Sequence, residues 1–147
     1  MRYITITVYP IDELEEKAKK KAIKEFRETK LGELVSKEGE KINCEAYLDV
    51  YENVELYMDD TSKGFLQGEE SIDYIQSLDI SSSLMQEAYT RYLKNYTKKS
   101  SVLDFIYCAN LVLSELYGSD DALEEYLKEE EYEFTEKGDI IDVSNPN

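Results

Sequence analysis

The longest uncharged stretch of the chain runs from Phe105 to Ser114, within a sequence that is otherwise densely charged. Its length and apolar content predict a helix, and apolar side chains fall on all sides of it, so other elements must cover it. Ser101 and Asp104 have the spacing of a capping box at its start, and Gly118 supplies a stop at its end. We therefore expect the core to form around residues 102–117.

Strict alternation of polar and apolar residues predicts a β-strand over residues 2–9, which is rich in β-branched and aromatic side chains. Ile4, Ile6 and Val8 would face inward, and Pro10 would end the strand.

A helix is expected next, capped by Asp12 with Glu15 and running to about Thr29. Its other face carries lysines and glutamates at spacings that allow ion pairs, which indicates an ordinary solvent-exposed face. The apolar stripe of this helix is Leu14, Ala18, Ala22 and Phe26.

Residues 31–60 fit two patterns at once. A strand pattern is formed by Ile42, Cys44, Ala46, Leu48 and Val50. A helical stripe is formed by Ile42, Ala46, Tyr47, Val50, Tyr51 and Val54. Length favours a helix from about Glu38 to Tyr51, followed by a short strand from Val54 to Met58.

Residues 59–70 have the outline of a calcium-binding loop, with Asp59 at the first position, Gly64 at the sixth and Glu70 at the twelfth. The fifth position must supply an oxygen ligand, and Lys63 supplies a positive charge instead. We therefore expect a surface loop and no metal site.

The second half of the sequence has mainly helical periodicity. A short helical segment is expected around residues 72–78, and Ser81–Ser83 signals the start of a helix that runs through Tyr96. Its aromatic stripe could be core or contact surface. This stripe is Met85, Ala88, Tyr89, Tyr92 and Tyr96.

An acidic helix and a hairpin are expected to close the chain. Ser119 or Asp120 caps the helix, whose inward residues are Leu123, Tyr126 and Leu127. Residues 132–135 and 139–143 then form a hairpin across the turn at 136–138. We expect an α+β fold, with a helical core packed with a small antiparallel β-sheet, in a single globular domain over residues 1–143 and a disordered tail over 144–147.

Composition excludes several kinds of chemistry. The chain has 147 residues and no histidine, so catalytic triads and histidine metal sites are absent. Cys44 and Cys108 indicate free thiols of a reducing compartment. No phosphate-binding glycine loop occurs. We therefore expect no enzyme activity, catalytic residue, cofactor or metal.

Charge is the main clue to partners. The formal net charge of −16 disfavours direct binding to nucleic acid or to anionic membranes and favours a basic protein surface. Tyrosines beside the acids, Tyr126 and Tyr132, are candidate anchors. The candidate contact residues of the first acidic block are Asp120, Asp121, Glu124, Glu125, Glu129, Glu130 and Glu131. Those of the second block are Asp49, Glu52, Glu55, Asp59 and Asp60.

Both ends of the chain carry a family resemblance. Residues 12–28 resemble the opening "EL-x-E-x-A-K-x-K-A" helix of a large group of small bacteriophage and prophage proteins, and residues 130–138 are similar to that group's closing "EYEFTEDG" hairpin. The segment Gly64–Gly68 is a remnant of the group's "GF-x-x-QGDG" loop. The resemblance implies a phage or mobile-element origin and transfers no catalytic residue.

These observations lead to one main hypothesis. We expect an acidic DNA mimic, a phage-encoded inhibitor of the anti-CRISPR type, that occupies the basic nucleic-acid-binding groove of a host CRISPR effector complex. The alternative is an oligomeric adaptor that binds through a tyrosine-rich apolar face, and a homodimer through Tyr89, Tyr92 and Tyr96 is compatible with either. With no apolar leader and no run of 18 apolar residues, we expect a protein of the host cytoplasm.

Overall fold

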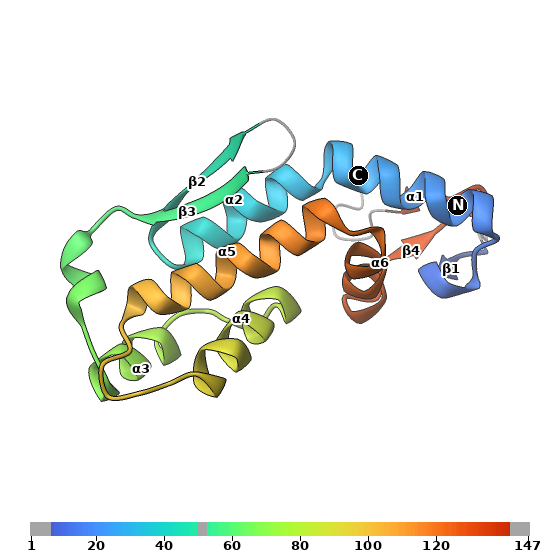
Figure 1. The fold of residues 1–147 in the computed structure, drawn as a ribbon. Helices are drawn as coiled ribbons and strands as arrows, with labels where there is room; N and C mark the ends of the chain where they lie inside the picture. Colours follow the sequence, from blue (N-terminus) through green and yellow to red (C-terminus); the bar gives the residue numbers. More distant parts are fainter. Residues whose placement is uncertain (1–6, 50–52, 142–147) are drawn as a thin grey trace, which may run out of the picture.

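The computed structural model describes residues 7–49 and 53–141, and it shows an elongated α+β protein (Figure 1). In that part of the chain, six α-helices accompany one three-stranded and one two-stranded antiparallel sheet. The helices are α1 (Glu16–Thr29), α2 (Leu31–Lys41), α3 (Glu69–Gln76), α4 (Ser83–Lys94), α5 (Val102–Gly118) and α6 (Asp120–Glu129). The strands are β1 (Tyr9–Pro10), β2 (Cys44–Asp49), β3 (Asn53–Met58), β4 (Glu133–Phe134) and β5 (Ile140–Ile141), and two 3₁₀ turns cover Ile11–Glu13 (η1) and Thr61–Phe65 (η2).

Helix α5 is the centre of the fold, as its uncharged sequence predicts. The backbone N–H of Ser101 donates to Asp104 Oδ2 at 2.9 Å at the start of the helix, which confirms the capping box. Figure 1 shows α5 between the β2–β3 hairpin and α4, with α6 beyond its C-terminal end. The buried residues of α5 are Val102, Phe105, Ile106, Ala109, Val112, Leu113 and Leu116.

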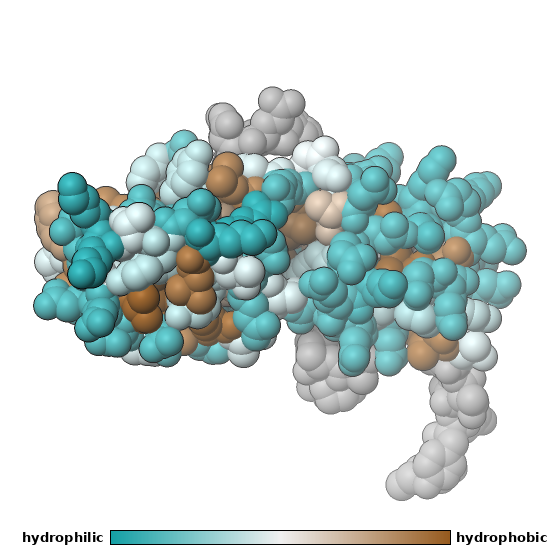
Figure 2. Space-filling view, turned by 60° about the horizontal axis from the view of Figure 1, so that its bottom comes forward, coloured by the Kyte–Doolittle hydropathy of each residue, from teal (hydrophilic) through white to brown (hydrophobic). Residues whose placement is uncertain are grey.

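The expectation that α5 is covered on all sides is wrong for one line of residues. Leu103, Tyr107 and Leu111 are exposed, and they recur every four residues, so they share one face of the helix. The exposed ring of Phe65 lies in the turn η2, which packs against Leu103 through Gly64. Elsewhere hydrophilic side chains dominate the surface drawn in Figure 2, and hydrophobic residues reach it in small groups.

The N-terminal region differs from its prediction in three ways. Strand β1 includes Pro10, which pairs with Glu133, and Val8 is exposed rather than inward. The 3₁₀ turn η1, which contains Asp12, follows β1, and α1 begins only at Glu16. Its N-cap Glu15 makes no side-chain capping bond, so the predicted cap of Asp12 with Glu15 is not formed. The rest of the predicted strand, with Ile4 and Ile6, lies outside the described residues.

The preferred interpretation of residues 38–51 as a helix is wrong. Helix α2 ends at Lys41, and Asn43 takes a positive φ of 53° before the chain enters β2. Strand β2 pairs with β3 from Cys44 opposite Met58 to Asp49 opposite Asn53. The strand pattern was therefore the correct one for Cys44–Asp49, whereas Ile42 lies before the strand and Val50 lies outside the described residues. The predicted strand at 54–58 is confirmed.

Helix α4 begins where the serine run predicts. Ser82 accepts a hydrogen bond from the backbone N–H of Met85 at 3.2 Å. Tyr92 of its aromatic stripe is buried against Phe105 of α5, and its hydroxyl lies 2.5 Å from the Ser71 hydroxyl of α3. This stripe is therefore mainly core, which argues against a dimer formed through Tyr89, Tyr92 and Tyr96.

The C-terminal hairpin is confirmed, with β4 between β1 and β5 in one antiparallel sheet. Gly138 in its turn has a φ of +93° and lies against the backbone of Ala18 in α1. This close approach fixes the small sheet on α1. The predicted tail, residues 144–147, lies outside the described residues. No described helix has the length and apolarity that crossing a lipid bilayer requires.

Candidate functional site

Helix α6 presents the first acidic block. Its N-cap is Ser119, whose hydroxyl accepts a hydrogen bond from the backbone N–H of Ala122 at 3.2 Å. Leu123, Tyr126 and Leu127 are buried, as their spacing predicts. Since these three residues hold one side of α6 against the core, the carboxylates emerge along its two flanks.

The flank facing α1 is neutralised by cations from that helix. Arg27 Nη2 lies 2.6 Å from Asp120 Oδ1, and Lys19 Nζ lies 2.8 Å from Glu124 Oε1. The hydrogen bond to Glu124 raises the pKa of Lys19 above its ordinary value. Asp120 and Glu124 therefore hold α6 to α1 rather than presenting free charge.

The opposite flank is a row of free carboxylates. Asp121, Glu125 and Glu129 are exposed and four residues apart, so they follow one line along the helix, about 6 Å per step. Within the described residues, no Lys or Arg nitrogen lies within 4 Å of them. This row is the part of the first block that can meet a basic partner.

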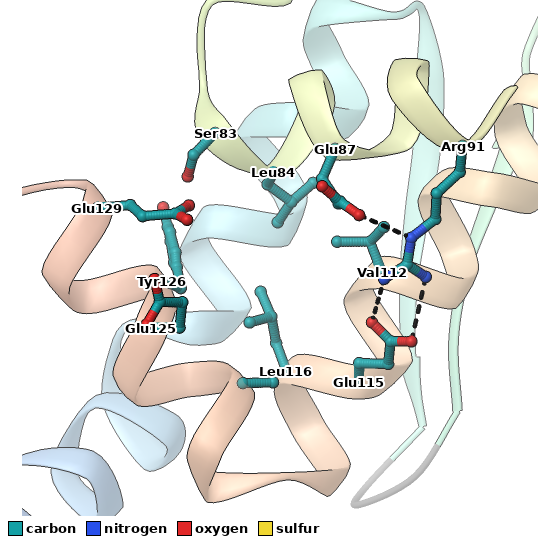
Figure 3. Close-up of a pocket in the computed structure, with 11 residues that line it drawn as sticks. Ser83, Leu84, Glu87, Arg91, Val112, Glu115, Leu116, Glu125, Tyr126 and Glu129 are labelled. Atoms are coloured by element: carbon teal, nitrogen blue, oxygen red, sulfur yellow. Dashed lines mark hydrogen bonds and ion pairs between the residues drawn. The ribbon is translucent and has the colours of Figure 1, made fainter. Parts of the chain in front are cut away.

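Two members of the row border a pocket between α4, α5 and α6 (Figure 3). The pocket has a volume of about 200 Å³. Its apolar wall is made by buried or half-buried side chains, and Glu125 and Glu129 lie on the α6 side. The apolar wall consists of Leu84, Val112, Leu116, Ala122 and Tyr126.

The one basic side chain of the pocket is already held by two glutamates. Arg91 Nη2 and Nη1 lie 2.6 and 3.1 Å from the two oxygens of Glu115, and its Nε lies 3.1 Å from Glu87 Oε1. The hydrogen bond to Glu115 and, to a smaller extent, the one to Glu87 raise the pKa of Arg91. Figure 3 shows this group across the pocket from Glu125 and Glu129.

The pocket therefore combines an apolar wall with excess negative charge, since four glutamates and one arginine line it. A lysine or arginine side chain suits such a site, because its hydrocarbon stem can lie on the apolar wall while its charge reaches a carboxylate.

Several predicted contact residues serve the fold instead. Tyr126 is buried, and burial raises the pKa of its phenol, so it forms pocket wall and is not an exposed anchor. Tyr132 is half-buried with its ring 5.3 Å from that of Phe26. Glu130 accepts a hydrogen bond from the backbone N–H of Ser83 at 2.8 Å and thereby joins α6 to α4. Glu131 is exposed just after α6.

The second acidic block belongs to a different part of the molecule. Glu55 is exposed on β3, and Asp59 and Asp60 are exposed just after it. Asp60 caps η2 by accepting from the backbone N–H of Ser62 at 3.0 Å. Asp49 is the last residue of β2, and the structure does not describe its side chain. Glu52 lies outside the described residues. Figure 1 shows β3 and the segment that follows it well away from α6, so the described part of the second block does not share a surface with the first block.

Sequence reasoning missed Glu87, Arg91 and Glu115, which belong to α4 and α5. A local signal existed, since Glu87 and Arg91 are four residues apart on one helix. The partner Glu115 is 24 residues from Arg91, and only the packing of α4 on α5 brings them together.

No protein-family model, curated protein or solved structure matches this chain. Among the described residues, no group of three or more Cys, Asp or Glu side chains could hold a metal ion. What the described arrangement contains is a row of unpaired carboxylates beside an apolar pocket wall.

Proposed function

We propose that the protein is a phage-encoded inhibitor of a host defence system, of the anti-CRISPR type, that occupies the basic nucleic-acid groove of a CRISPR effector nuclease. Such grooves hold their substrate through Lys and Arg contacts to phosphates. A rigid helix with regularly spaced, unneutralised carboxylates competes for the same contacts. The protein acts in the host cytoplasm, where these nucleases work.

The observation that carries this proposal is the asymmetry of α6. Its α1-facing flank is neutralised by Lys19 and Arg27, whereas Asp121, Glu125 and Glu129 are free and exposed. The adjoining pocket gives one basic side chain of the partner a place to insert.

The test compares two triple charge reversals with the same change in net charge. One variant is Asp121→Lys, Glu125→Lys and Glu129→Lys. The control is Glu28→Lys, Glu40→Lys and Glu136→Lys, at exposed positions away from the row. DNA cleavage by a panel of purified, guide-loaded CRISPR nucleases is measured with each protein present.

We expect the wild type and the control to inhibit at least one nuclease, and the α6 variant to lose inhibition. Inhibition by the wild type should also weaken steeply as salt rises, because ions screen exposed charges. Equal potency of the two variants, or inhibition that is insensitive to salt, would contradict groove occupancy.

A second candidate function is an adaptor that binds through an apolar face. The exposed line Leu103, Tyr107 and Leu111 on α5, with Phe65 beside it, favours this candidate. Apolar pairing is maintained or strengthened by salt, so the same salt series separates the two functions. The triple substitution Leu103→Ser, Tyr107→Ser and Leu111→Ser should abolish adaptor binding and leave groove occupancy intact.

A further inference from the structure

The outer face of the β2–β3 hairpin carries a second arrangement of exposed groups. Alternation along the strands turns Cys44, Val54, Leu56 and Met58 toward the core. The residues between them point outward: Glu45 and Tyr47 on β2, and Glu55 and Tyr57 on β3. We call these four side chains the hairpin face.

The strand register makes the hairpin face a checkerboard of acids and rings. Glu45 lies opposite Tyr57, and Tyr47 lies opposite Glu55, so each carboxylate has a ring both across from it and beside it. The two rings are 5.4 Å apart between centroids and inclined at 72°, and each is about half exposed. Two half-exposed rings in edge-to-face contact and two carboxylates thus share one patch.

Each phenol donates a hydrogen bond to the glutamate two residues before it. Tyr47 donates to Glu45, and Tyr57 donates to Glu55. One oxygen of each carboxylate is thereby held in place, and the other oxygen stays open to a ligand. These bonds raise the pKa of both tyrosines above the ordinary 10.0, so the phenols keep the protons that they donate.

Charge selects the kind of occupant. No Lys or Arg occurs from Ile42 to Ser62, whereas six Asp or Glu residues fall in that segment. Among the described residues, no cation pairs with Glu45 or Glu55. An acidic occupant would be repelled, and a purely apolar one would leave the carboxylates without partners.

We propose that the hairpin face docks an arginine side chain from a basic segment of a partner protein. The flat guanidinium can stack on a tyrosine ring while its N–H groups donate to Glu45 or Glu55. A lysine ammonium, a compact and strongly hydrated charge, satisfies only part of this arrangement. The inference goes beyond the proposed function, because it uses no residue of α6 and does not require a groove.

The test uses the full chain and two capped five-residue peptides of equal charge, Gly-Arg-Gly-Arg-Gly and Gly-Lys-Gly-Lys-Gly. Each is titrated into ¹⁵N-labelled protein while backbone amide signals are followed by NMR. We expect saturable shifts centred on residues 44–47 and 54–58, with tighter binding of the arginine peptide. Equal affinity for both peptides, or shifts confined to α6, would overturn the proposal.

Variants identify the groups responsible. Tyr47→Phe with Tyr57→Phe keeps both rings and should keep most of the preference for arginine. Tyr47→Ala with Tyr57→Ala should weaken arginine binding about tenfold. If the NMR amide signals show that the hairpin of the alanine variant is unfolded, the double variant Glu45→Gln with Glu55→Gln is tested instead. Unchanged arginine binding by that variant would refute the proposal. Tyr107→Ala, at an exposed ring on α5, is the matched control.

The peptide titration and the nuclease assay test the two proposals independently. All hairpin variants retain Asp121, Glu125 and Glu129, so the nuclease assay reports on α6 whatever the peptides do.

Discussion

The side-chain oxygen of Asn110 accepts a hydrogen bond from the backbone N–H of Leu56 at 2.8 Å. A polar residue in the uncharged part of α5 thus supplies an acceptor for one backbone N–H of β3. The bond joins residues 54 positions apart and fixes the hairpin beside the helix. It explains why Asn110 interrupts an otherwise apolar run.

Replacing Asn110 with Ala should lower the free energy of unfolding by about 1–3 kcal/mol, because the partly buried N–H of Leu56 loses its acceptor. Urea unfolding measures the loss, and faster hydrogen exchange at the Leu56 amide localises it. Ser114→Ala, at an exposed position of the same helix, should change stability little. An unchanged exchange rate at Leu56 would contradict this role for Asn110.

Gly138 and Gly118 should respond oppositely to alanine. A Cβ at Gly138 would overlap the carbonyl oxygen of Ala18, and φ is +93° there, so Gly138→Ala should cost about 2–4 kcal/mol. Gly118 has no atom within 4 Å of such a Cβ and no left-handed φ, so Gly118→Ala should be neutral or stabilising by up to about 1 kcal/mol. Thermal unfolding of both variants checks the contrast, and equal losses would refute it.

Glu38 gives the fold a specific pH dependence. Its side chain is 2% exposed, and burial raises its pKa above the ordinary 4.5, although Lys41, with Nζ at 3.5 Å, opposes the shift. Because the folded state binds this proton more tightly than the unfolded state, the contribution to stability is complete below pH 4.5. It is lost as the pH rises from 4.5 through the raised pKa.

The substitution Glu38→Gln removes that loss. We expect the stability of the variant, relative to the wild type, to increase as pH rises from 4 to 7, because glutamine in place of the buried carboxyl stays neutral at every pH. Melting temperatures across this range measure the difference. Glu40→Gln, at an exposed position of the same helix, should show no such trend. A pH-independent difference for Glu38→Gln would contradict the assignment.

The two thiols should differ in reactivity. Burial, with a contribution from Asp59, raises the pKa of Cys44 to about 12, and Cys108 is only partly buried. Since the thiolate is the reactive form, a maleimide at pH 8 should modify Cys108 first and Cys44 only after unfolding. Mass spectrometry over time checks the order, with the Cys108→Ser variant as the single-thiol reference. Simultaneous modification would show that Cys44 is accessible in the folded state.

The parts of the fold that the sequence predicted depend on signals within one element. The absence of charge from Phe105 to Ser114 located α5, and serine caps located α4 and α6. The error at residues 38–51 arose because Ile42, Ala46 and Val50 fit both periods, and length was a poor guide to a helix that ends at Lys41 and a strand that begins at Cys44.

The candidate site was predicted only in outline, because local sequence cannot show which charges are already paired. The acids of α6 were visible, but Lys19 and Arg27, which neutralise two of them, are about a hundred residues away. Tyr126 was a different case. Its place in the stripe with Leu123 already indicated burial, and that pattern was a better guide than the frequency of tyrosine at interfaces.

The exposed line of Leu103, Tyr107 and Leu111 has a consequence for handling the protein. At neutral pH the net charge of −16 keeps molecules apart, so this line stays hydrated. Near the isoelectric point of about 4.4 that repulsion vanishes, and the line becomes a contact through which molecules associate. Colloidal stability therefore depends on the carboxylates being ionised, and acidification toward pH 4.4 should lower the solubility of the protein.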